Sequence, residues 1–277
     1  MGAELHPWNH DFQFEVPETA PTTVTEDERV RFARDGYLVV PSILSDDERT
    51  ALTAELDRLE EGMDEFLATQ EGGRFLIGER GAITFSPHAV LKSDAARATA
   101  FHPRLLGLCR DLLGADVNLY WDQAVYKKTE KPRRFPWHQD TGYNFVQPQS
   151  YLTCWLALTD ATEANGCPWV VPGAHRAGTL RHRWVEPLGW QCLEAPDNAV
   201  AAPVPAGGAV VFSSLTPHLT GPNQTAEVRK AYIVQYALAG TCVMEGDPRS
   251  GPPRRGIPQD DPGRQFPVLR SGKAVLA

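Results

Sequence analysis

Apolar positions in the first 115 residues recur at helical spacing. The clearest case follows Ser45–Glu48, whose Ser-x-x-Glu pattern is that of a capping box and predicts the start of a helix. Behind it, apolar side chains return every three or four residues, which predicts a single buried stripe along one side of the helix. The stripe consists of Leu52, Leu56, Leu59, Met63 and Phe66.

Two more helices and one strand are predicted in this part of the chain. Thr25–Glu28 is a second capping box, and Gly36 ends the short helix that it opens. The apolar run Tyr37–Val40 follows as a compact strand that stops at a proline. Another helix is expected over residues 94–113, because its apolar side chains again repeat at helical spacing. Its inward-facing residues are Leu105, Leu106, Cys109 and Leu112.

From Asp116 onward the pattern changes to short runs of β-branched and aromatic residues. Turns that contain glycine or proline, such as Asn165-Gly166 and Pro172-Gly173, separate these runs. Many short strands with this punctuation are typical of a double-sheet jelly roll. We therefore expect a mainly β fold with flanking helices around a double-stranded β-helix (jelly roll, cupin-like) core. The predicted strands are 117–128, 152–159, 168–171, 209–213 and 231–239.

The same pattern predicts how the chain is divided. Residues 1–24 hold several prolines and charged residues and are expected to form an N-terminal arm. Residues 25–277 are expected to form a single domain, which is helical over 25–115 and has its jelly-roll core at about 116–245. A loop-rich tail is expected over 246–277, since proline, glycine, aspartate and arginine dominate its first part.

Composition and charge narrow the class of protein. A net charge of −8 and a pI of about 5.5 argue against nucleic-acid binding, which needs a basic face. No segment is apolar over the length that a membrane span requires, and the N-terminus lacks a signal-peptide pattern. Five scattered cysteines without a C-x-x-C pair predict reduced thiols and a cytoplasmic protein. The expected partner is a small-molecule substrate, and the chain is expected to be a monomer or a homodimer.

The candidate chemistry centres on His138 and Asp140. In an extended backbone, residues two apart project to the same side, so both side chains can reach one metal ion while Gln139 points away. With His218 from a distant strand they would form the two-histidine, one-carboxylate triad that holds non-haem Fe(II) and leaves coordination positions open. The alternative is an edge strand with two exposed polar residues, together with a structural His218.

Arg229 adds a second candidate group. It opens the last strongly predicted strand, just after the segment that carries His218. A guanidinium on a neighbouring strand can grip a carboxylate through two parallel hydrogen bonds. A dicarboxylate could then chelate iron at one end and contact Arg229 at the other. The alternative is a surface arginine at the start of a strand.

A set of motifs gives the chain a family resemblance. It resembles the phytanoyl-CoA dioxygenase (PhyH) family of Fe(II)/2-oxoglutarate-dependent oxygenases from Phe32 to the strand of Arg229. The eleven-residue spacing between His218 and Arg229 is that of the family. The other matching motifs are Trp137-His138-Gln139-Asp140, Trp155-Leu156-Ala157-Leu158-Thr159-Asp160, Asn165-Gly166-Cys167 and Val171-Pro172-Gly173-Ala174-His175-Arg176.

The resemblance implies Fe(II) as the metal, 2-oxoglutarate as co-substrate and O2 as oxidant. It implies that Arg229 binds the distal carboxylate of 2-oxoglutarate, with help from the hydroxyl of Thr220. It also implies that Trp155 and Gln123 line the co-substrate site, with Thr153 as a further candidate. Family members carry an upstream lysine at this site that has no assigned match in the chain. The implied iron ligands are His138, Asp140 and His218.

The expected reaction is hydroxylation of an unactivated C–H bond of a small molecule, for example a secondary metabolite, with release of succinate and CO2. The carboxylate of Asp140 argues against halogenation, since halogenases of this class have a small residue there. Desaturation, epimerisation and ring formation remain open. Two other classes are a non-redox, cupin-like metal-binding protein, which does not explain Thr220 and Arg229 at these positions, and a catalytically silent scaffold, which does not explain the complete set of metal ligands.

Several further residues have weaker patterns. Residues 68–92 and 176–200 are candidate lids over the substrate. His175 and Arg176 are expected to be structural, and His182 is expected in a solvated, flexible loop of the kind that covers the substrate in this family. A basic run is interpreted either as a solvated surface or as a binding site for an anionic substrate. Three aromatic residues are interpreted as walls of a pocket. The basic run is Lys127, Lys128, Lys131, Arg133 and Arg134, and the aromatic residues are Tyr126, Tyr143 and Phe145.

Overall fold

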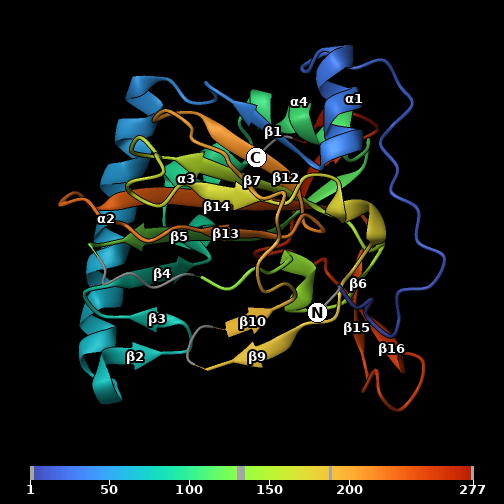
Figure 1. Cartoon of the computed structure of the whole chain (residues 1–277). Coiled ribbons are helices and arrows are strands. Elements are labelled where there is room, and N and C mark those ends of the chain that lie inside the picture. Colours follow the sequence, from blue (N-terminus) through green and yellow to red (C-terminus); the bar gives the residue numbers. More distant parts are fainter. Residues whose placement is uncertain (1–2, 130–134, 187–188, 276–277) are drawn as a thin grey trace.

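A large antiparallel sheet forms the centre of the structure, a computed structural model that describes residues 3–129, 135–186 and 189–275 (Figure 1). Eight strands follow one another in the order β1-β12-β7-β14-β5-β4-β3-β2, and two more extend the sheet from β5. Strands close together in space therefore come from both ends of the chain. The strands are β1 Tyr37–Val40, β2 Arg74–Phe75, β3 Gly78–Glu79, β4 Ile83–Pro87, β5 Val117–Lys127, β7 Leu152–Ala157, β12 Ala209–Ser213, β14 Arg229–Leu238, β17 Pro267–Arg270 and β18 Lys273–Ala274.

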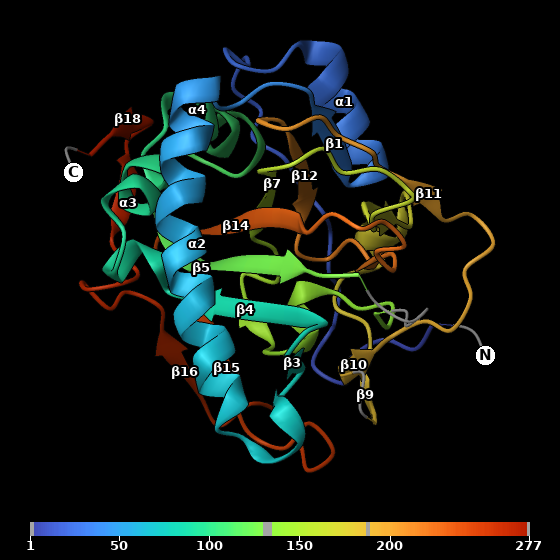
Figure 2. The same cartoon turned by 90° about the vertical axis from the view of Figure 1, so that its left-hand side faces the viewer.

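Helices cover one face of this sheet, and α2 crosses in front of β14, β5 and β4 (Figure 2). Because side chains alternate along a strand, every second residue of the central strands points into the helical layer. Leu119 of β5, Cys154 of β7 and Val234 of β14 are completely buried there. The helices are α1 Glu26–Asp35, α2 Asp46–Ala68, α3 Asp94–Ala100 and α4 Pro103–Leu112, with short 3-10 turns η1 Glu71–Gly73, η2 Ala89–Leu91, η3 Asp140–Gly142 and η4 Ala174–Ala177.

Smaller sheets lie against the opposite face. One has the order β11-β8-β13, and a backbone bridge joins His138 to His218 at its edge. The two facing sheets confirm the predicted mainly β fold with a double-stranded β-helix core and flanking helices. The remaining strands are β6 Val146–Gln147, β8 Pro168–Val170, β9 Arg183–Val185, β10 Gly189–Gln191, β11 Val200–Ala201, β13 His218–Thr220, β15 Cys242–Glu245 and β16 Arg255–Pro258.

The helix predicted over residues 94–113 is two helices, α3 and α4. Pro103 has no backbone N–H to continue a helix, and the side chain of His102 instead caps α4 by accepting a hydrogen bond from the N–H of Arg104. The break changes the direction of the chain but keeps the predicted inward side chains, all of which are buried. They are Leu105, Leu106, Cys109 and Leu112.

The tail is more ordered than its composition predicts. β16 lies within the segment interpreted as loop, and β17 pairs with β5 in the central sheet. Phe266, Val268 and Leu269 are buried in the main core. The loop-rich tail predicted over 246–277 therefore also contains strands and buried apolar residues, most of which follow the proline-rich part on which the prediction rested.

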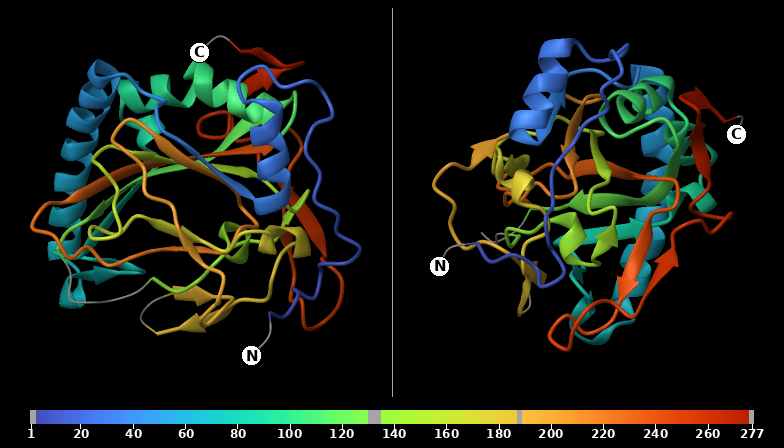
Figure 3. Two further views of the ribbon diagram at one scale, coloured as in Figure 1. Left: turned by 45° about the horizontal axis from the view of Figure 1, so that its top comes forward. Right: turned by 90° about the vertical axis from the view of Figure 1, so that its right-hand side faces the viewer.

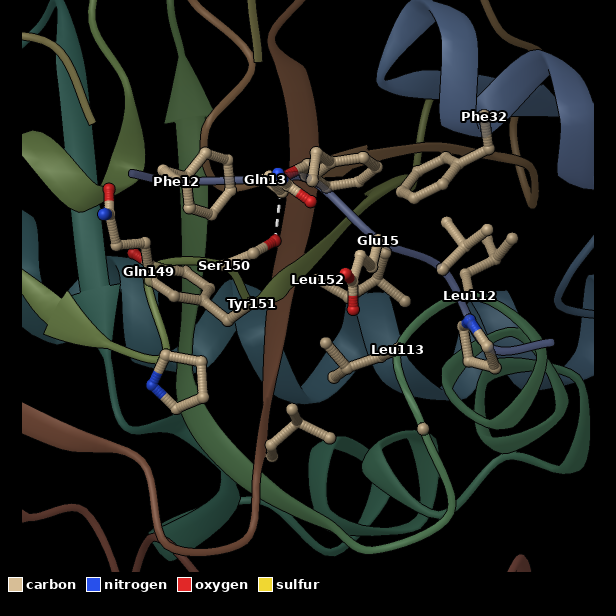
Figure 4. Close-up of a pocket in the computed structure, with 17 residues that line it drawn as sticks. Phe12, Gln13, Glu15, Phe32, Leu112, Leu113, Gln149, Ser150, Tyr151 and Leu152 are labelled. Atoms are coloured by element: carbon tan, nitrogen blue, oxygen red, sulfur yellow. Dashed lines mark hydrogen bonds between the residues drawn. The ribbon is translucent and has the colours of Figure 1, made fainter. Parts of the chain in front are cut away.

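The N-terminal arm is attached to the body at several points, and its path along one side is visible in Figure 3. Near its end the carboxylate of Asp111 accepts hydrogen bonds from the N–H groups of Thr22, Thr23 and Val24 at 2.8, 2.6 and 3.2 Å. Gly107 on α4 allows this approach, because a Cβ atom there would lie 2.0 Å from the hydroxyl of Thr23. A cavity of about 420 Å³ remains between the arm and the body, lined by residues such as Phe12, Leu113 and Tyr151 (Figure 4).

No helix in the described ranges is long and apolar enough to cross a bilayer. All five cysteines lie within those ranges and are free; Cys109, Cys154 and Cys167 are buried, and Cys192 and Cys242 are half-buried.

A buried carboxyl in the helical layer predicts a pH-dependent stability. Asp122 accepts hydrogen bonds from the N–H of Val90 and the hydroxyl of Tyr232, both at 3.0 Å. Burial nevertheless raises its pKa from 3.8 to about 6. The folded protein therefore keeps this proton up to about pH 6, whereas the unfolded chain releases it near pH 4, so stability falls as the pH rises between these values. A tenfold change in proton affinity is worth about 1.4 kcal/mol, so the loss is at most roughly 3 kcal/mol.

Asp122→Asn keeps an acceptor oxygen but replaces the carboxyl group with an amide that does not titrate. We expect the free energy of unfolding of this variant, relative to the wild type, to be higher at pH 7.5 than at pH 4.5. Urea denaturation at the two pH values measures the difference, and an equal effect at both would contradict the assignment.

Candidate metal centre

The structure brings His138, Asp140 and His218 together. One potential ligand atom from each lies within 4.8 Å of the others. The backbone explains the meeting of residues 80 positions apart: the N–H of each histidine donates to the carbonyl of the other, at 3.0 and 2.8 Å. This two-way bridge holds both imidazoles beside each other, with ring centroids 4.3 Å apart.

The predicted extended backbone is present at Gln139, whose φ and ψ are −102° and 147°. Its side chain therefore points away from the two potential ligands and is completely buried. There the amide donates to the carbonyls of Gly178 and Leu215 and accepts from the N–H of Leu180. The strand does not continue beyond this point, since Asp140 begins the 3-10 turn η3. The side chain of Gln139 thus fixes the backbone between His138 and Asp140 from the side opposite the potential metal ligands.

Both imidazoles are oriented for metal binding through Nε2. Nδ1 of His138 donates to the carbonyl of Pro136 at 2.9 Å, and Nδ1 of His218 donates to the carbonyl of Thr216 at 3.0 Å. A carbonyl can only accept, so each Nε2 carries the lone pair. Burial lowers the pKa of His138 well below its usual range, which keeps the ring neutral. Two imidazole nitrogens together with one carboxylate form a donor set that suits a divalent iron ion.

Asp140 is held by two neighbours. Its Oδ2 accepts from the hydroxyl of Thr153 at 2.6 Å and from the amide of Gln235 at 3.0 Å, while Oδ1 lies 3.7 Å from Nε2 of His218. The family resemblance implied a co-substrate contact for Thr153, whereas the structure gives it this contact with the carboxylate. Gln235 was missed. It lies directly opposite Thr153 across β7 and β14, on the face that also carries Arg229.

Removing the hydroxyl of Thr153 is expected to weaken iron binding. Groups that hydrogen-bond to a metal ligand typically contribute ten- to a hundredfold in metal affinity. We expect Thr153→Val to lower Fe(II) affinity by about that factor, and Thr153→Ser, which keeps the hydroxyl, to stay close to the wild type. Anaerobic Fe(II) titration with a competing chelator measures both. Equal affinities for the valine and serine variants would contradict this role.

A buried cationic region lies beside the triad. Arg229 is 1% exposed, and its guanidinium carbon lies 4.9 Å from the centre of the Trp155 ring. On the neighbouring strand, directly opposite Arg229, Lys127 is completely buried and donates to the hydroxyl of Thr220 at 3.3 Å and to the carbonyl of Gly221 at 2.7 Å. Two cations and a hydroxyl in a buried position fit the charge of a carboxylate.

The basic run predicted from sequence does not form one surface. Lys127 points inward, as its position four residues beyond Gln123 on the same face of β5 requires. Lys128 points to the opposite side of the strand, towards α2, and contacts Glu60 and Asp64, each at 3.0 Å. The other members, Lys131, Arg133 and Arg134, lie outside the described residues.

The potential ligands and the cationic region open into one cavity of about 760 Å³. Gln123, Thr153, Trp155, Thr220 and Arg229, the residues expected at the co-substrate, all line it. Tyr143 lines it too, as predicted. The other two aromatic residues do not: Tyr126 donates to Asp57 on the helical side, and Phe145 stacks on His6 of the arm.

The prediction of a solvated His182 is wrong. Its Nε2 accepts from the N–H of Gln139 at 2.9 Å, and its Nδ1 donates to the carbonyl of Leu180. Burial lowers its pKa to about 4, so the ring is neutral and supports the segment between His138 and Asp140. His175 is buried against Phe14 and contacts the carbonyl of Ala33, which agrees with its predicted structural role.

Comparison with known proteins adds independent information. The family profile described as phytanoyl-CoA dioxygenase (PhyH) matches residues 32–231. An ectoine dioxygenase of Stutzerimonas stutzeri (strain A1501) is 29% identical over 236 residues, which cover 77% of each chain. A methylphosphonate hydroxylase of Gimesia maris is 29% identical over 239 residues, which cover 82% of this chain and 85% of the relative. The structure of the epimerase SnoN in complex with Fe3+, alpha ketoglutarate and nogalamycin RO has a TM-score of 0.68 at 27% identity, covering 87% of this chain and 97% of that one.

Proposed function

The chain belongs to the phytanoyl-CoA dioxygenase (PhyH) family, and we propose that within this family it hydroxylates an unactivated C–H bond of a small molecule. It is an Fe(II)- and 2-oxoglutarate-dependent dioxygenase. When bound, Fe(II) and 2-oxoglutarate would supply the electrons that activate O2, and O2 is the oxidant that breaks such a bond, with succinate and CO2 as co-products. The observation that carries the proposal is the convergence of His138, Asp140 and His218 beside the buried Arg229 in one cavity.

We propose that the three convergent residues hold the iron ion. The two Nε2 atoms and Oδ1 of Asp140 are the atoms available for this, because the other polar atoms of these side chains are occupied by the carbonyls of Pro136 and Thr216 and by Thr153 and Gln235. These hydrogen bonds fix the ligand orientations before the metal binds. The protein then spends little conformational entropy on forming the site.

We propose that the distal carboxylate of 2-oxoglutarate binds Arg229 and Thr220. Lys127 orients the Thr220 hydroxyl and adds positive charge on the same side. Trp155 lies against the guanidinium and limits its movement, and Gln123 is available for a hydrogen bond on the neighbouring strand. The arrangement would orient the co-substrate with its other end towards the metal ligands.

The catalytic domain is proposed to span residues 25–277, with residues 1–24 as an attached arm. The central sheet supports this extent, because it combines strands from Tyr37 to Ala274.

Hydroxylation is favoured by the similarity to the methylphosphonate hydroxylase named above, and the intact carboxylate of Asp140 argues against halogenation. Epimerisation is the second candidate, since the SnoN structure has a similar fold at 27% identity. Incubation with Fe(II), 2-oxoglutarate and a small-molecule library under ¹⁸O2, followed by mass spectrometry, distinguishes the two. Hydroxylation predicts a product that gains one labelled oxygen atom. Succinate formation with a product of unchanged mass would instead support epimerisation, and a product that has lost two hydrogens would support desaturation or ring formation.

A further inference from the structure

The part of the cavity beyond the metal ligands and the cationic region has its own chemistry. We propose that it binds an uncharged, fused-ring aromatic substrate, such as a polycyclic phenol or quinone. This inference rests on the proposed function, which assigns the remaining charged groups of the cavity to the metal and the co-substrate. It goes further by naming the class of molecule that is oxidised.

The lining of the cavity is dominated by aromatic side chains. Twelve of the 31 described lining residues are Phe, Tyr or Trp, although these make up only 9% of the chain. Nearly half of the 25 aromatic residues in the sequence therefore surround this one space. Aromatic rings pair with flat rings in offset or edge-to-face arrangements that aliphatic walls cannot offer. The lining thus favours a substrate with its own ring system over a flexible acyl chain.

Exposed aromatic side chains gather at the mouth of the same cavity. Phe66, Phe75, Tyr143 and Trp184 are 38%, 50%, 41% and 42% exposed, and Leu76 beside them is 79% exposed. Every exposed Phe, Tyr or Trp of the described ranges belongs to the lining. Apolar groups left open to water in one patch are typical of a binding site. A large apolar ligand would cover them.

Three elements form the walls around this mouth: the end of α2, the hairpin β2–β3 and the hairpin β9–β10, which lie at the same end of the molecule (Figures 1 and 2). Each wall carries paired rings or close contacts. Phe66 of α2 meets Phe75 of β2 edge-on at 5.3 Å, and Trp184 meets Trp190 in the same way at 5.7 Å. A Cβ atom on Gly189 would lie 3.3 Å from Ile77, so the two hairpins approach each other closely.

Charge excludes several other substrate classes at the described lining. Its only charged side chains are Asp140 and Arg229, which the proposed function uses for the metal and the co-substrate. A zwitterionic amino acid or a phosphonate would need further charged partners once it leaves water. The remaining neutral groups include the amides of Gln123 and Asn144. These can hydrogen-bond to a phenol or quinone oxygen without requiring a charge.

The volume also fits a molecule larger than the co-substrate. Ligand sites for drug-sized molecules are about 300–1,000 Å³, and this cavity is about 760 Å³. A five-carbon dicarboxylate takes up only a small part of it. The rest of the space lies between aromatic walls.

The test measures binding apart from turnover. The full-length protein, loaded anaerobically with Fe(II) and 2-oxoglutarate, is dialysed to equilibrium against 1,8-dihydroxyanthraquinone, and separately against a hydroxyflavone, L-proline, methylphosphonate and palmitoyl-CoA. We expect saturable binding of at least one fused-ring probe, at least tenfold tighter than that of the other three compounds. Trp190→Ala should weaken it by at least tenfold, whereas Trp190→Phe, which keeps a ring, should change it by less than about threefold.

Two further variants guard against misfolding and nonspecific adsorption. Phe75→Ala removes a half-exposed ring at the mouth and should also weaken binding, whereas Trp8→Phe, on the arm, should not change it. No saturable binding of either fused-ring probe, or tighter binding of proline, methylphosphonate or palmitoyl-CoA, would overturn the inference. Equal binding by all variants would overturn it as well.

Succinate measured in parallel keeps the two proposals apart. Formation of succinate from 2-oxoglutarate without probe binding would leave the proposed oxygenase function intact and refute the substrate class. Probe binding without any succinate would leave the aromatic binding site intact and count against the proposed oxygenase function.

Discussion

His138→Ala is expected to abolish 2-oxoglutarate turnover, with a loss of at least about a thousandfold in succinate formation. The variant loses one of three proposed metal ligands and also the ring that lies beside His218. A bound metal ion supplies several kcal/mol of the reaction's stabilisation, and about 1.4 kcal/mol corresponds to tenfold in rate. The loss should therefore be seen even at saturating 2-oxoglutarate.

The control for this variant is His10→Ala, which removes an exposed histidine of the arm and should leave turnover unchanged. Circular dichroism and thermal unfolding check that His138→Ala remains folded. Turnover within tenfold of the wild type in a folded His138→Ala protein would contradict the metal-ligand assignment.

Arg229→Ala is expected to raise the KM for 2-oxoglutarate by about a hundredfold. A hydrogen bond to a charged group contributes about 1.5–3 kcal/mol, and here the carboxylate would also be left buried with less positive charge around it. We expect Arg229→Lys to recover part of the affinity, because it restores the charge but not the paired geometry of a guanidinium. Initial rates of succinate formation at varied 2-oxoglutarate measure both variants.

Arg176→Ala serves as the matched arginine variant, because Arg176 is exposed and outside the cavity lining. Its KM should equal that of the wild type. Should Arg229→Ala leave the KM for 2-oxoglutarate unchanged and lower only kcat, the carboxylate-binding role would be wrong.

Local patterns were sufficient to predict much of the fold. The capping boxes at Thr25 and Ser45 begin α1 and α2 as expected, because both signals are contained within four residues. The apolar stripe of α2 is buried at Leu52 and Leu56, but Phe66 at its far end is 38% exposed. The periodicity showed that the apolar residues lie on one side of the helix. It could not show that the stripe ends at the mouth of a cavity.

The residues of the candidate site could likewise be predicted only in part from local patterns. The pair His138 and Asp140 was recognisable because two-residue spacing in extended backbone has a direct geometric meaning. His182 was misjudged because the arginines on both sides of it suggested a solvated loop, and its contact with Gln139 crosses 43 residues. Such a long-range contact has no local pattern.

Gln235 was missed, and Lys127 was assigned only to the basic run, although a signal for both was present in the sequence. Both lie an even number of residues from a predicted site residue on the same strand, Lys127 four from Gln123 and Gln235 six from Arg229. Strand alternation therefore places each on the cavity face. A polar residue at such a position in an otherwise apolar strand identifies a further member of a site.

The most direct test of the central claim is an anaerobic titration with Fe(II) and 2-oxoglutarate, followed in the visible spectrum. The proposed site predicts a weak charge-transfer band that requires both components and disappears in His138→Ala, and succinate should form when oxygen is admitted to the wild type. A wild-type protein that shows neither the band nor succinate, or a His138→Ala protein that keeps both, would contradict the assignment of the iron and 2-oxoglutarate site to these residues.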